Sequence, residues 1–125
     1  MAETKRQHIV YVLTQGPSHA EIVLFPFIHA VGALATDIDA SIVLMGSAVM
    51  VAQKGVAKHV RMVGKPPLDE LMKNLFELGG KLYICTPCFK MRGYDENNDL
   101  IEEGIPIAAA TYNELLLNAD AVVSY

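Results

Sequence analysis

Two cysteines three positions apart, Cys85 and Cys88, are the only cysteines in this 125-residue sequence. They lie in the segment YICTPCFKMRG at residues 83–93, directly after an apolar run, and Lys90 and Arg92 follow them. A cysteine acts as a nucleophile or a metal ligand when it is a thiolate, and neighbouring cations favour that form. The segment can therefore be a metal clip, a dithiol redox pair, a sulfur-handling nucleophile or a pair of buried hydrophobic residues.

The residues between and after the cysteines indicate a short helix. Thr86 is a good N-cap and Pro87 a good first helical residue, so the cysteines flank the positive end of the helix. The helix dipole and the two basic residues together predict a lowered pKa for Cys85. The alternative is that Cys85, which ends an apolar run, is simply buried and unreactive.

Other readings of the cysteine pair fit less well. A zinc site takes about four ligands, and none of the four histidines lies at finger or ribbon spacing, so we expect no metal and no cofactor. A thioredoxin-like dithiol normally follows an early strand and opens a long helix. Here Gly93 is expected to end the helix after about two turns.

Two further segments could suggest a ligand but do not match the motifs. A calcium-binding loop starting at Asp95 would need glycine at Leu100 and glutamate at Pro106. The segment TQGPSH at 14–19 has one glycine and lacks the Gly-Lys-Ser/Thr of a phosphate loop. We therefore predict neither calcium nor nucleotide binding.

The elements that must position the cysteines alternate along the chain. Five short apolar runs are continuous rather than alternating, which is typical of parallel strands that are covered on both faces. The predicted strands are residues 8–14, 40–46, 81–86, 105–110 and 121–125. Cys85 lies at the end of the third run, and catalytic groups gather at the carboxyl ends of parallel strands.

Helical patterns separate these strands. The predicted helices are residues 18–35, 47–54, 67–78 and 110–120. Ser18 and Glu21 have capping-box spacing at the first start, and Pro26 is expected to kink or split that helix. The sequence thus predicts one α/β domain over residues 1–125, a parallel five-stranded sheet with helices on both faces.

Composition limits the class of protein. Hydrophobic residues make up 52% of the chain and charged residues 19%, which excludes a disordered chain. No apolar run approaches the roughly 20 residues that span a bilayer, and no secretion signal is recognisable, so we expect a cytoplasmic protein without a membrane partner. A net charge of −4 without a basic stripe argues against direct nucleic-acid binding.

With these elements in place, the sequence resembles the DsrE/DsrF-like family, which includes YchN-like proteins and TusD-type sulfur-relay subunits. The resemblance rests on YIC at the end of a strand, on Arg-Gly seven and eight residues after Cys85, on an acidic loop, and on PIAAATYNELLLNADAVVSY at residues 106–125. It implies a parallel α/β fold, a homotrimer or homohexamer, and in relay members a cysteine that carries sulfur as a persulfide. The matching position is Cys85. Cys88 departs from the relay pattern, which leaves dithiol chemistry open.

The expected function is that of a sulfur carrier or sulfurtransferase in which Cys85 accepts sulfane sulfur from a donor protein and passes it to an acceptor protein. Arg92, with a planar fork of donors, and Lys90, a mobile point charge, can hold the negative charge of the product. One alternative is a thiol–disulfide redox protein that uses Cys85 and Cys88 as a pair. Another is a non-catalytic oligomer that binds a small molecule.

Overall fold

The computed structural model describes residues 6–125 and contains a five-stranded sheet in the order β4-β3-β2-β1-β5. All neighbouring strands pair in parallel, which confirms the predicted sheet. The strands are β1 (His8–Leu13), β2 (Asp39–Leu44), β3 (Lys81–Cys85), β4 (Gly104–Ile107) and β5 (Ala121–Ser124). Each strand begins within one residue of its predicted start.

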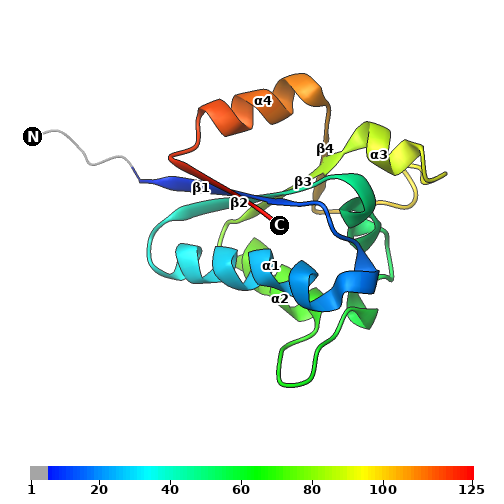
Figure 1. Ribbon diagram of the computed structural model, residues 1–125, viewed down its shortest axis with the longest axis horizontal. Helices are drawn as coiled ribbons and strands as arrows, with labels where there is room; N and C mark the ends of the chain where they lie inside the picture. The colour runs from blue at the N-terminus through cyan, green and yellow to red at the C-terminus, as the bar shows by residue number, and fades with distance from the viewer. Residues whose placement is uncertain (1–5) are drawn as a thin grey trace, which may run out of the picture.

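Helices cover both faces of the sheet, as predicted. Helices α1 (Ala20–Ala35) and α2 (Leu68–Glu77) lie on one face, and α4 (Ala109–Leu117) crosses the other (Figure 1). The chain adds β1 to β4 in one direction, so right-handed crossovers keep α1 and α2 on the same face. The return from β4 to β5 at the opposite edge reverses this direction, which sends α4 to the other face.

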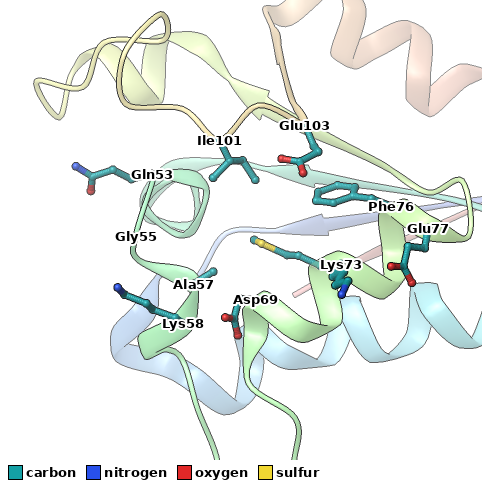
Figure 2. Close-up of a pocket in the computed structure, with 11 residues that line it drawn as sticks. Gln53, Gly55, Ala57, Lys58, Asp69, Lys73, Phe76, Glu77, Ile101 and Glu103 are labelled. Carbon is teal, nitrogen blue, oxygen red and sulfur yellow. The ribbon is translucent and has the colours of Figure 1, made fainter.

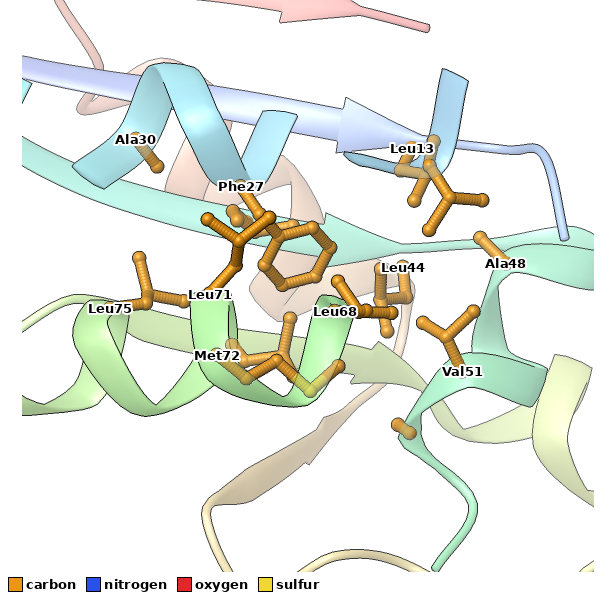
Figure 3. Close-up of a cluster of buried hydrophobic side chains, with 14 of the residues drawn as sticks. Leu13, Phe27, Ala30, Leu44, Ala48, Val51, Leu68, Leu71, Met72 and Leu75 are labelled. Atoms are coloured by element: carbon orange, nitrogen blue, oxygen red, sulfur yellow. The ribbon is translucent and has the colours of Figure 1, made fainter. Parts of the chain in front are cut away.

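The main core lies between the sheet and the first two helices. The α2 side chains Leu68, Leu71, Met72 and Leu75 are all buried there, at the spacing expected of one helical face. Figure 3 shows the ring of Phe27 from α1 beside Leu68 and Leu71, filling the space between the two helices. Because Phe27 is fully buried, it joins both helices to the sheet.

A smaller core lies under α4. It consists of Val10, Val12, Val43 and Ile107 from the sheet, with half-buried residues of α4 packed against them. All residues of α4 are exposed or half-buried, and all residues of β5 are exposed. This face of the sheet is therefore covered much more thinly than the other.

The start of α1 differs from the prediction. A 3-10 turn, η1 (Pro17–His19), precedes it, and His19 rather than Ser18 is the N-cap. The Ser18 hydroxyl lies 3.1 Å from Nδ1 of His19 and makes no capping bond, so the predicted capping box is wrong. The helix also continues through Pro26 without a break. Pro26 costs one backbone hydrogen bond, but its buried ring packs in the core, and packing outweighs local propensity.

The shorter helical segments also differ in type from the prediction. The helix expected at 47–54 is a 3-10 helix, η2 (Gly46–Ala52), and a further 3-10 turn, η3 (Ala57–His59), follows it. Helix α3 (Thr86–Lys90) follows β3 directly, and Gly93 lies just beyond it with a left-handed φ of 79°. This conformation favours glycine and confirms the predicted end of the helix.

The segment 17–35 is long and apolar enough, by length and composition alone, to cross a membrane. In this fold α1 instead packs against β1, β2 and α2. Its buried residues are Val23, Leu24, Pro26, Phe27, Ala30, Ala33 and Leu34. The core of the domain thus accounts for the apolar character of this helix.

We expect Phe27→Ala to lower the free energy of unfolding by about 3–5 kcal/mol, because it removes a fully buried ring from between two helices. Val63, which is fully exposed in the loop before α2, offers a control, and Val63→Ala should change stability by less than about 0.5 kcal/mol. Urea unfolding followed by circular dichroism measures both. Equal effects for the two variants would contradict this account of the core.

Candidate active site

The candidate site lies where three neighbouring strands end. β3 pairs with β2 on one side and β4 on the other, so their carboxyl ends meet at one edge of the sheet. Cys85 lies opposite Ile107 in the register, and Ile84 lies opposite Leu44. The residue after Leu44, Met45, therefore comes close to Cys85 from the other side. These contacts follow directly from parallel pairing.

Cys85 opens into a cavity of about 140 Å³. Its other lining residues come from the ends of β2 and β4 and from the starts of α3 and α4: Val43, Met45, Pro87, Ile107, Ala108, Ala109 and Tyr112. All eight lining side chains are uncharged. The N-cap of α4 is Ala108, whose methyl side chain cannot accept a hydrogen bond from the first-turn N–H groups. The cavity is thus apolar, with a helix start at its wall.

The structure places the two cysteines close together at the start of α3. Cys85 is the N-cap of α3, one residue earlier than the predicted Thr86, and Pro87 is within the first two helical positions. Both thiols are free and half-buried. The two residues are close enough for the thiol and the backbone N–H of Cys88 to affect the pKa of Cys85.

The second cysteine is held by a backbone group. The Gly46 N–H, in the turn that follows β2, donates a hydrogen bond of 3.3 Å to Sγ of Cys88. Gly46 has a left-handed φ of 57°, a conformation that disfavours other residues. This turn therefore fixes the position of the Cys88 sulfur relative to the sheet.

The pKa of the Cys85 thiol is raised, so the predicted lowering is wrong. Burial is the largest cause, and the side-chain hydrogen bond and the charge interaction with Cys88 raise the pKa further. The Cys88 N–H and the Arg92 guanidinium lower it but do not offset burial. The predicted lowering relied on the dipole of α3. Because this helix has only five residues, its dipole is weak.

The two basic residues act differently. Arg92 donates a hydrogen bond of 2.9 Å to the Cys88 carbonyl and lowers the pKa of Cys85 through its charge. Nζ of Lys90 instead lies 4.0 Å from a carboxylate oxygen of Glu96, and the Lys90 side chain is largely exposed. Neither residue lines the cavity beside Cys85. Of the predicted basic pair, the structure brings Arg92 to the cysteines.

A larger cavity of about 450 Å³ lies elsewhere, against α2. Figure 2 shows Phe76 pointing into it beside Glu103, with Lys58 pointing outward. Its lining side chains carry both signs of charge, and the two cysteines lie elsewhere. Size alone therefore does not make this cavity the reactive site.

Two of the four histidines have structural contacts away from the cysteines. Nδ1 of His29 lies 2.6 Å from the Tyr125 hydroxyl, and Nε2 of His8 lies 2.8 Å from the Ser41 hydroxyl. Within residues 6–125, no group of three or more His, Cys, Asp or Glu side chains is arranged to hold a metal ion.

Sequence reasoning missed the walls of the Cys85 cavity and the Gly46 contact. A signal was present, because these residues follow predicted strands whose carboxyl ends must meet at one edge. The order of the strands in the sheet could not be read from the sequence. Because β3 lies between β2 and β4, the ends of these two strands flank Cys85, and those of β1 and β5 do not.

The fold and the site define a small parallel α/β protein with a half-buried cysteine at the carboxyl end of a strand. The chain belongs to the DsrE/DsrF-like family, whose model it matches over residues 7–125, as the resemblance predicted. Membership of this family indicates a function of the general sulfur-relay type.

Relatives and solved structures agree on the family and fold. Two uncharacterized proteins of Methanocaldococcus jannaschii are each 32% identical to this chain. The match to MJ0989 covers 91% of this chain and 96% of MJ0989, and the match to MJ0760 covers 87% of this chain. The chain spans only 39% of MJ0760.

The crystal structure of the YchN protein from E. coli matches 95% of this chain and 99% of its own, with a TM-score of 0.79 and 20% identity. MTH1491 from Methanobacterium thermoautotrophicum, a protein of unknown function, matches 97% of this chain and 100% of its own with a TM-score of 0.70 and 13% identity. Because the sequence identities are this low, the structural matches support the fold alone.

We expect Arg92→Met to raise the pKa of Cys85 further, because it removes a charge that stabilises the thiolate. Iodoacetamide alkylation as a function of pH, in a Cys88→Ser background, reports this pKa. Lys90→Met is the matched control and should leave the profile unchanged, since Lys90 lies against Glu96. A larger shift for Lys90→Met than for Arg92→Met would contradict the assignment.

Proposed function

We propose that this protein is a sulfur carrier or sulfurtransferase in which Cys85 takes up sulfane sulfur as a persulfide. The observation that carries the proposal is the half-buried Cys85 thiol, at the carboxyl end of a strand and open to an apolar cavity. A persulfide needs shelter from water and small thiols, and this surrounding offers such shelter. Membership of a family linked to sulfur relay supports the same reading.

The proposed loading step conserves atoms and electrons. The Cys85 thiolate attacks the outer sulfur of a donor persulfide, the donor S–S bond breaks, and the donor leaves as a thiolate that takes up a proton. An acceptor thiolate then attacks the outer sulfur on Cys85, which restores the Cys85 thiol. Both steps are thiol–disulfide exchange chemistry and need no cofactor.

The raised pKa of Cys85 fits a carrier that reacts only with the right donor. A thiol that is mostly protonated at neutral pH reacts slowly with small oxidants and alkylating agents. Arg92, which lowers this pKa and bonds the Cys88 carbonyl, is the cation nearest to the chemistry. It can stabilise the charge that develops on sulfur.

A dithiol function is the second candidate, and the proximity of the two thiols favours it, because Cys88 is close enough to affect the pKa of Cys85. The Cys88 thiolate can attack the inner sulfur of a Cys85 persulfide, which expels hydrosulfide and closes a disulfide between the two residues. A thiol reductant must then return both cysteines to thiols. In this scheme Cys88 resolves the intermediate, with its sulfur held by the Gly46 N–H.

We further propose a cytoplasmic homotrimer or homohexamer that meets sulfur donor and acceptor proteins, without direct contact to nucleic acid or membrane. The thin cover on the α4 face supports the assembly. Leu117 is 85% exposed and Val122 is 47% exposed. Apolar side chains of this size on neighbouring elements favour contact with another subunit.

Light scattering at micromolar concentration tests the assembly. We expect a trimer or hexamer for the unmodified protein and a smaller species for the double variant Leu117→Glu with Val122→Glu, because buried carboxylates oppose association. Val63→Glu, in an exposed loop, is the control and should keep the assembly. A monodisperse monomer of the unmodified protein would refute the proposal.

Intact mass after treatment with a persulfide donor tests the roles of the cysteines. A carrier should gain about 32 mass units for one added sulfur. Cys85→Ser should abolish this gain, whereas Cys88→Ser should keep it and lose only hydrosulfide release. Loading on Cys88 alone would move the carrier role to that residue. Loss of two hydrogens without any sulfur adduct would favour the redox function instead.

A further inference from the structure

We infer that the cavity beside Cys85 selects persulfides on a short, uncharged alkyl arm, such as the cysteine side chain of a donor protein, and excludes charged or bulky arms. This inference rests on the proposed function, because it names the class of persulfide that can reach Cys85. It is carried by the size of the cavity, by the chemistry of its lining and by the presence of the thiol in its wall.

Size sets the first limit. A volume of about 140 Å³ holds roughly four or five non-hydrogen atoms, at the ~30 Å³ that one water molecule occupies in the liquid. Two sulfurs and two or three carbons fill this space. Val43 and Ile107 are buried in the smaller core and fix one side of the cavity, whereas Pro87, Ala108 and Ala109 lie on its exposed side. A tripeptide thiol such as glutathione exceeds this volume.

Charge sets the second limit. All lining side chains are uncharged, and Arg92 and Lys90 lie outside the lining. A carboxylate, sulfonate or ammonium on the alkyl arm would lose its hydration in the cavity without gaining a charged partner there. An arm of either sign is therefore disfavoured, whereas attraction to Arg92 alone would favour anions.

The proposed donor reacts by the loading step given above. The donor R–S–SH, with R a short alkyl group, places its outer sulfur against the Cys85 thiolate. The new bond forms between Cys85 and that sulfur, and the bond between the two donor sulfurs breaks. The alkyl thiolate R–S⁻ leaves and is protonated by water, so no oxidant or reductant is consumed.

Alkyl methanethiosulfonates test the cavity directly, because the Cys85 thiolate displaces methanesulfinate and becomes the mixed disulfide with R–S. In a Cys88→Ser variant, the rates of modification are compared for methyl, propyl, benzyl, 2-sulfonatoethyl and 2-(trimethylammonio)ethyl reagents. Each rate is divided by the rate for a small free thiol at the same pH. We expect the normalised propyl rate to exceed that of both charged reagents by about tenfold or more.

Two alanines in the first turn of α4 provide a matched pair of variants. Ala109 and its neighbour Ala110 are both exposed, but Ala109 lines the cavity and Ala110 does not. Ala109→Leu fills the cavity and should slow the propyl reagent about tenfold while slowing the methyl reagent less. Ala110→Leu adds the same side chain to the same helix and should leave all rates unchanged.

Equal normalised rates for neutral and charged reagents would overturn the inference, even if the protein still loads sulfur. A selective series of rates in a protein that takes up no sulfur would instead uphold the cavity as a selective thiol site and refute the sulfur-carrier function. If one charged reagent reacted more slowly than the propyl reagent and the other reacted faster, the selectivity would come from charge attraction. That result would also overturn the inference.

Discussion

The parallel pairing of β3 with β2 on one side and β4 on the other is the constraint on which the site depends. The register sets Cys85 beside Ile107 and makes three segments that are distant in sequence meet around one sulfur. A slip of β3 by one residue would turn Cys85 toward α2 and expose Ile84, because side chains alternate along a strand. Ile84 is almost fully buried in the main core and opposes this slip. The alternation of side chains along β3 that buries Ile84 in the core therefore also places the Cys85 thiol on the opposite face of the sheet.

Burial gives the thiol shelter and takes away part of its reactivity. The main cause of the raised pKa of Cys85 is the loss of water, which is also what an apolar cavity provides. Arg92 acts against this effect from outside the lining of the cavity, where it is half-buried and donates a hydrogen bond to the Cys88 carbonyl. A cation inside the cavity would activate the thiol more strongly, at the cost of its own desolvation. The arrangement suits a nucleophile that must persist between a donor and an acceptor.

The sequence was sufficient for the sheet and for the pair of cysteines. Continuous apolar runs predict parallel strands, and the strand end at Cys85 predicts its place at the edge of the sheet. Local rules failed where tertiary packing decides the outcome, as in the cap at His19, and Pro26 does not split the helix. The pKa of Cys85 could not be derived from neighbours in sequence. Its main cause is burial by residues of β2, β4 and α4, and their proximity depends on the strand order.

The reversal of winding after β4 connects the cavity to the least buried part of the molecule. Because α4 must return across the sheet to place β5 at the far edge, its first turn forms one wall of the cavity beside Cys85. The rest of α4 lies on a small core and is largely exposed. Elements with few buried contacts open locally at low cost in free energy. The stability of α4 thus sets how long this wall of the cavity stays in place beside Cys85, and any contact that covers Leu117 and Val122 would also stabilise the site.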